Sequence, residues 1–130
     1  MIKDFSKFNV LVVDDVPLNQ ILVTKMLSRY NFQVRTASNG LEAMEAIREK
    51  KPSVILLDIM MPVMDGFEVL RLLKAKKDTE NIRVIILSAL NSNKDIIKGY
   101  ELGANDFITK PIIMEKLVNS VATQLQLTEA

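Results

Sequence analysis

Each of four short apolar runs leads, at once or after one residue, to a polar side chain that could serve phosphoryl chemistry. The pairs are residues 10–13 with Asp14 and Asp15, 54–57 with Asp58, 84–87 with Ser88, and 107–108 with Lys110. Such runs are typical of the buried strands of a parallel sheet. In an open sheet of that type, ligands bind outside the carboxyl ends of the strands. We therefore expect these polar groups to converge on one sheet edge, which would be the active site.

The acidic residues are suited to attack phosphorus or to bind a cation. Asp58 could act as a nucleophile and become an aspartyl phosphate, although Asp is also common where a strand ends in a turn. Asp14 and Asp15 would each disfavour ionisation of the other unless a cation lay between them. Alternatively, one of the pair faces solvent and the other helps to cap the next helix. The backbone carbonyl of Met60 could supply a further metal ligand, whereas its side chain is expected to pack.

A hydroxyl and an amine could supply the hydrogen-bond donor and the positive charge that stabilise phosphoryl oxygens. The Ser88 hydroxyl can donate a hydrogen bond, and the small Ala89 leaves space beside it, although a lone Ser is more often a turn or cap residue. Pro111 restricts Lys110 to extended geometry and is compatible with a cis peptide bond. Loose phosphoryl transfer needs a nucleophile, a dication and further positive charge, so the combination is more informative than any single residue.

Composition limits the metal and the location. The 130 residues include no cysteine and no histidine, so a bound metal must be held by oxygen, which favours Mg²⁺, with Mn²⁺ able to substitute. The net charge of +1 argues against direct binding of nucleic acid. Neither a stretch of transmembrane length nor a signal peptide is evident, so we expect no membrane insertion and a cytoplasmic location. The length predicts one domain, residues 1–130.

Strands and helices are expected to alternate five times. The helices are predicted from Pro17, from Asn39 with Glu42 as capping partner, from Asp65 with Glu68, from Ser92 to Gly103, and from Ile112 to Gln126. Their apolar faces are expected to include Ile21, Leu22, Met26 and Leu27 in the first helix and Leu41, Met44 and Ile47 in the second. The alternating segment 32–36 suits an edge strand. Right-handed crossovers then allow an α/β, flavodoxin-like doubly wound (βα)5 sandwich, with a five-stranded parallel sheet in the order 2-1-3-4-5.

The chain resembles the receiver domain of two-component response regulators, of the single-domain chemotaxis type. Four segments carry the resemblance, in the family's order and spacing: VLVVDDVPLNQ from residue 10, VILLDIMMPVMDG from residue 54, VIILSA from residue 84, and GANDFITKP from residue 103. The resemblance extends from about Phe8 to Gln126. It implies a phosphorelay switch that catalyses only its own phosphorylation and dephosphorylation.

The resemblance also implies a role for each site residue. Asp58 would be the phosphoacceptor, receiving its phosphoryl group from a phosphohistidine on a histidine kinase or phosphotransfer protein. Asp15, Asp58 and the Met60 carbonyl would bind Mg²⁺ directly, with Asp14 acting through water. Ser88 and Lys110 would hold the phosphoryl group, and the bond between Lys110 and Pro111 would be cis.

The implied switch involves Ser88 and Phe107. Ser88 would move toward the new phosphoryl oxygens, and Phe107 would turn into the vacated space, although from the residues alone Phe107 is better explained as a buried strand residue. The surface of the fourth helix, fifth strand and fifth helix would then change its affinity for a downstream protein, which the sequence does not identify.

Two departures from the family pattern affect these expectations. Ser88 stands where Thr is commoner, which keeps the hydroxyl. Asn105 and Asp106 replace a paired acid, and Val118 and Asn119 lie where an Arg is often found, so dimerisation through that face is doubtful.

The sequence disfavours three other functions. A flavin-phosphate site after the first strand would need a loop of N–H donors, whereas Asp14 and Asp15 would repel phosphate. Aspartyl phosphatases commonly carry a second Asp two residues after the nucleophile, where this chain has Met60. A receiver-like protein that is never phosphorylated is disfavoured because all five site positions are present.

Overall fold

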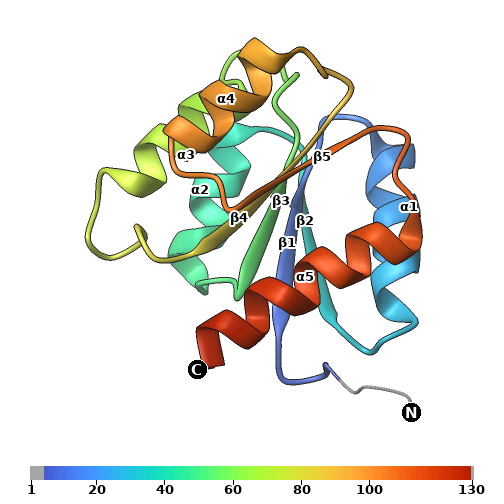
Figure 1. Cartoon of the computed structure of the whole chain (residues 1–130). Coiled ribbons are helices and arrows are strands. Elements are labelled where there is room, and N and C mark those ends of the chain that lie inside the picture. The colour runs from blue at the N-terminus through green and yellow to red at the C-terminus, as the bar shows by residue number, and fades with distance from the viewer. Residues whose placement is uncertain (1–4, 130) are drawn as a thin grey trace.

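A computed structural model describes residues 5–129 of the chain, with side chains described as far as Gln126. Five parallel strands form one sheet in the order β2-β1-β3-β4-β5 (Figure 1). The strands are β1 (Asn9–Val13), β2 (Gln33–Ala37), β3 (Val54–Leu57), β4 (Arg83–Ser88) and β5 (Asp106–Thr109). The predicted fold class and strand order are therefore confirmed, with the alternating segment at an edge.

A helix follows each strand, and the helices form two layers. They are α1 (Pro17–Ser28), α2 (Gly40–Glu49), α3 (Gly66–Lys74), α4 (Asn93–Glu101) and α5 (Met114–Glu129). Helices α1 and α5 cover one face of the sheet, and α2, α3 and α4 cover the other (Figure 1). Alternate strand residues point to opposite faces, so Val12 packs with the α1 and α5 core whereas Leu11 and Val13 pack with the other.

Parallel registry brings the strand ends level. Val13 of β1 pairs with Ala37 of β2 and with Leu57 of β3. In turn, Leu57 pairs with Ile86 of β4. The residues that follow these positions therefore emerge at the same edge of the sheet, as the sequence predicts.

Side-chain caps start three of the helices as predicted. Asn39 accepts a hydrogen bond from the Glu42 N–H at 2.9 Å, and Asp65 accepts one from the Glu68 N–H at 2.9 Å. Ser92 accepts one from the Asp95 N–H at 3.2 Å. Such bonds satisfy donors that have no partner inside the helix. After α4, Gly103 has φ +108°, a left-handed conformation that suits the glycine expected there.

The predicted buried faces of α1 and α2 are partly wrong. Ile21, Leu22 and Leu41 are all exposed. Leu27 and Ile47 are buried as predicted, and α1 also buries Val23 while α2 also buries Gly40 and Ala43. Small residues at 40 and 43 let α2 lie close to its neighbours, so a stripe of larger side chains is not needed to fill the space.

Candidate functional site

The three acids meet at the carboxyl edge of the sheet. The Asp14 N–H donates to the Ala37 carbonyl at 3.1 Å, and the Asp58 N–H donates to the Val13 carbonyl at 2.9 Å. These backbone bonds extend the two ladders by one residue, so both carboxylates leave the sheet side by side. Carboxylate oxygens of Asp14, Asp15 and Asp58 all lie within 4.8 Å of one another. Such an all-oxygen cluster could hold a hard dication.

Lys110 lies between two of the acids. Its Nζ atom is 3.1 Å from Asp14 Oδ2 and 3.4 Å from Asp58 Oδ2, and both carboxylates are largely buried. The Lys110 N–H also donates to the Ser88 carbonyl at 2.8 Å, which joins the ends of β4 and β5. The peptide bond between Lys110 and Pro111 is cis. Residues far apart in the sequence therefore form one site.

Each carboxylate also has backbone partners. Asp14 Oδ1 accepts a hydrogen bond from the Val16 N–H at 2.9 Å, directly before α1, so Asp14 serves the loop as well as the acidic cluster. Asp58 Oδ1 accepts one from the Met60 N–H at 3.0 Å. Burial raises the pKa of the Asp58 carboxyl, against the opposing effects of the Met60 N–H and the Lys110 ammonium. The buried carboxylates of Asp14 and Asp58 thus carry more negative charge than the Lys110 ammonium balances, in a position that is poorly solvated.

Ser88 and Met60, two further predicted site residues, differ in how far their side chains are buried. The Ser88 side chain is fully buried at the end of β4, and its Oγ accepts a hydrogen bond from the Leu90 N–H at 3.1 Å. Ala89 next to it is exposed. The Met60 side chain is 53% exposed, so the expectation that it packs is wrong. Only its backbone takes part in the site.

The site combines a buried carboxylate, an acidic oxygen cluster and an ammonium group within hydrogen-bonding distance of two of the acids. These are groups that phosphoryl transfer can use. The family model of the response regulator receiver domain matches residues 10–122. The chain belongs to the receiver domain family. It is a phosphoacceptor domain of two-component signalling and thus a signalling switch.

Known receiver proteins and structures agree over most of the chain. It is 45% identical over 103 residues to "Response regulator PleD" of Caulobacter vibrioides, covering 79% of this chain and 23% of that protein. It is 37% identical to "Protein PilH" of Pseudomonas aeruginosa, covering 86% of this chain and 93% of that protein. The receiver domain of Francisella response regulator 1452 aligns with a TM-score of 0.86 and 33% identity, covering 93% of this chain and 98% of that one.

The extent of the match differs between relatives. This receiver domain spans about a quarter of the length of PleD and of a probable cyclic di-GMP phosphodiesterase of Vibrio cholerae. Within residues 5–129, no helix of this receiver domain has the length and apolar character needed to cross a membrane.

Two residues of the receiver site were missed in the sequence. Gln20 Nε2 donates to the Asp14 carbonyl at 2.6 Å and to Ser38 Oγ at 3.1 Å, which ties the loop after β1 to the loop after β2. Gly66 lies so close to the strand end that a Cβ atom there would be 2.4 Å from the Asp58 carbonyl oxygen. Neither contact produces a regular spacing of residues that could be recognised in the sequence. Gly66 is nevertheless the last residue of the motif that contains Asp58.

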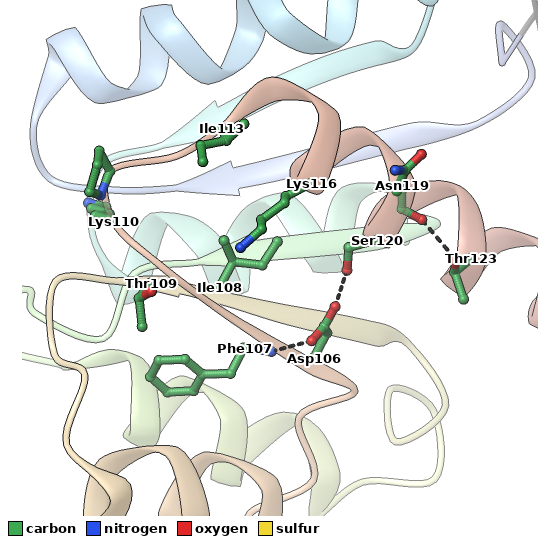
Figure 2. A pocket seen from close by; sticks show the side chains of 11 residues that line it. Asp106, Phe107, Ile108, Thr109, Lys110, Ile113, Lys116, Asn119, Ser120 and Thr123 are labelled. Carbon is green, nitrogen blue, oxygen red and sulfur yellow. Dashed lines mark hydrogen bonds between the residues drawn. The ribbon is translucent and has the colours of Figure 1, made fainter.

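The receiver domain also has a hollowed face between β5 and α5. A groove of about 620 Å³ lies there. Figure 2 shows Phe107, Ile113 and Lys116 among the side chains that line it. Asp106 accepts hydrogen bonds from the Phe107 N–H at 2.8 Å and from the Ser120 hydroxyl. Asp106 is one of the residues at which the sequence departs from the family's dimerisation pattern. Its carboxylate is hydrogen-bonded within its own chain.

Proposed function

We propose that Asp58 is the phosphoacceptor of this receiver domain. The supporting observation is the position of Lys110, whose ammonium lies 3.4 Å from Asp58 Oδ2 and 3.1 Å from Asp14 Oδ2. A carboxylate at the end of a central strand, beside a fixed cation and two further acids, is positioned for attack on phosphorus. The donor is a phosphohistidine on a histidine kinase or phosphotransfer protein.

The transfer exchanges one bond to phosphorus for another. An Asp58 carboxylate oxygen forms a bond to phosphorus as the bond from phosphorus to the donor's imidazole nitrogen breaks. The imidazole leaves with the electron pair and takes a proton from solvent. Lys110 stabilises the charge on the phosphoryl oxygens, and the Ser88 hydroxyl donates to one of them. The domain thus catalyses its own phosphorylation and, through attack by water, its own dephosphorylation.

The acidic cluster suits Mg²⁺, with Mn²⁺ as a substitute. Asp14, Asp15 and Asp58 offer oxygen atoms within 4.8 Å of one another, and the Met60 backbone carbonyl is a further oxygen donor. When bound, the dication neutralises charge on the transferring phosphoryl group. The residues themselves hold the acceptor in place, because their backbone hydrogen bonds belong to the sheet ladder.

Phosphorylation would be read out on the face formed by α4, β5 and α5. Ser88 would exchange its Leu90 contact for a phosphoryl oxygen, and the half-buried Phe107 would move. Phe107 lies close to α4, since a Cβ atom on Gly99 would be 3.2 Å from its ring. A movement of the ring would therefore change its contacts with α4 and the shape of the groove between β5 and α5. The partner is a downstream protein whose affinity differs between the two states.

Loading with a small acyl phosphate tests the acceptor. Wild-type protein with Mg²⁺ should gain one phosphoryl group by intact-protein mass spectrometry, and should bind beryllium fluoride by ¹⁹F NMR. Asp58→Asn should do neither, while Asp78→Asn, an exposed surface variant, should behave as wild type. Normal loading of Asp58→Asn would contradict the assignment of Asp58 as the acceptor. Loading of the wild type after chelation of all metal would contradict the role of Mg²⁺.

A further inference from the structure

A second hollow adjoins the acidic cluster on the face of the sheet covered by α1 and α5. This cavity of about 320 Å³ lies between α1, the sheet and the segment that follows β5. Val12, Leu56 and Leu87 of the three central strands line it, together with Val23 and Met26 of α1. All five side chains belong to the apolar core or pack against it. The cavity is therefore an apolar extension of the core that opens toward the site.

Three charged side chains that contact one another line the cavity, namely Asp14, Asp58 and Lys110. Among the other described lining residues only Asn19 is polar. Two carboxylates and one ammonium leave an excess of one negative charge. A neutral apolar molecule would leave that charge uncompensated, and an anion would be repelled by it.

We propose that this cavity binds a small organic cation with an apolar body, of the aralkylammonium or alkylammonium class. The volume lies within the range of about 300–1,000 Å³ that is usual for small-molecule sites. The apolar body would be removed from water against the more exposed lining side chains, those of Leu22, Met26 and Ile112. The ammonium would form charge-assisted hydrogen bonds with the carboxylates of Asp14 and Asp58.

Binding there would oppose loading of the receiver site. An organic ammonium and Mg²⁺ would neutralise the same two acids, Asp14 and Asp58, so each should lower the affinity of the protein for the other. The cation would then act as an inhibitor of phosphorylation. This consequence rests on the proposed magnesium site, whereas occupation of the cavity does not.

Phenethylammonium is the probe, titrated into metal-free protein and followed by ¹H–¹⁵N NMR. The expected result is a saturable shift of amides around the cavity. The neutral isostere 2-phenylethanol should bind about tenfold more weakly, because it lacks the charge-assisted bond. Phenylacetate should bind more weakly still. Absence of a saturable shift, or phenylacetate binding as tightly as the ammonium, would overturn the proposal.

Two adjacent residues of α1 provide a matched pair of variants. Leu22 is 48% exposed and lines the cavity, whereas Ile21 is 51% exposed and does not line it. Leu22→Trp should block the cavity and weaken phenethylammonium binding at least tenfold, while Ile21→Trp should leave it unchanged. Equal binding to both variants would refute the location. Unfolding temperatures of the two variants identify any loss that comes from misfolding.

A Mg²⁺ titration separates this inference from the proposed function. Phenethylammonium should raise the apparent Kd for Mg²⁺ in wild-type protein, and should have much less effect in Leu22→Trp. If Mg²⁺ fails to bind at all, the proposed metal site is wrong, while the metal-free titration still decides the cavity. If both bind without affecting each other, the proposed competition is wrong.

Discussion

The ammonium of Lys110 lies 3.1 Å from a carboxylate oxygen of Asp14, although 96 residues separate the two in the chain. The sheet brings them together, because β1 and β5 are separated by only β3 and β4 in the strand order. Asp58 lies at the end of β3, between them. The ion pairs of Lys110 therefore form only in the folded sheet. Removing this lysine should lower the stability of the fold and also impair phosphoryl transfer.

Lys110→Met should destabilise the metal-free protein by about 3 kcal/mol, because two largely buried carboxylates lose their cation. Millimolar Mg²⁺ should restore much of that stability by binding to the folded state. Urea unfolding with and without Mg²⁺ measures both quantities. Lys116→Met is the control, since Lys116 is exposed on α5. A loss of stability that Mg²⁺ leaves unchanged would contradict the shared acidic site.

Asp58→Asn should stabilise the metal-free protein at neutral pH. Burial raises the pKa of Asp58 above its ordinary value of 3.8, so the folded state binds the proton more tightly than the unfolded state does. The stability this carboxyl contributes is therefore fully present below pH 3.8 and is lost as the pH rises through the higher folded-state pKa. The gain from Asn should shrink as the pH falls from 7 toward 4. Thermal unfolding in a chelator checks this; a gain that grows on acidification would disprove the assigned direction.

Gly66→Ala should destabilise the protein by about 2–3 kcal/mol, because its Cβ would lie 2.4 Å from a backbone oxygen that cannot easily move. The variant should also shift the Asp58 backbone and slow phosphoryl loading. Gly40→Ala is the matched control at the start of α2. There the Cβ would meet the Met64 side chain, with its sulfur at 2.7 Å and its Cβ at 2.9 Å, and no backbone atom of another segment is among the nearest atoms. The loss should therefore be smaller than at Gly66. Equal losses from both variants would contradict the close approach at Gly66.

Val63→Asn should stabilise the protein by about 1 kcal/mol, because Val63 has φ +68°, a conformation that β-branched residues avoid. Its side chain is 98% exposed, so little packing is lost. Asn31 has φ +67°, and Asn31→Val should destabilise by a similar amount. Urea unfolding of both variants checks the pair of opposite signs. Changes of the same sign would show that backbone strain does not control these positions.

The sheet could be predicted from the sequence because its three central strands contain short, continuous apolar runs. Runs 10–13 and 54–57 lie within β1 and β3, and the polar residues after them emerge where the parallel arrangement requires. The acids, Ser88 and Lys110 were predicted at the right edge for that reason.

Helix faces and close approaches were less predictable. Helix α1 carries apolar residues on more than one side, so the pattern did not show that Val23 is buried while Ile21 and Leu22 are exposed. The importance of Gly66 depends on how near α3 comes to the Asp58 backbone. The exposure of Met60 depends on the path of its loop. These are properties of packing in three dimensions, which local spacing does not contain.

The registry between β1 and β3 has a consequence for how this protein can vary. Val13 pairs with Leu57, and the next residue on each strand is an acid of the site. Deleting one residue inside either strand would turn the following carboxylate toward the opposite layer of helices and separate the cluster. Insertions in the loops at the amino ends of these strands would leave that alignment intact. Changes of length should therefore be tolerated at the edge of the sheet remote from Asp58, and excluded from the strands themselves.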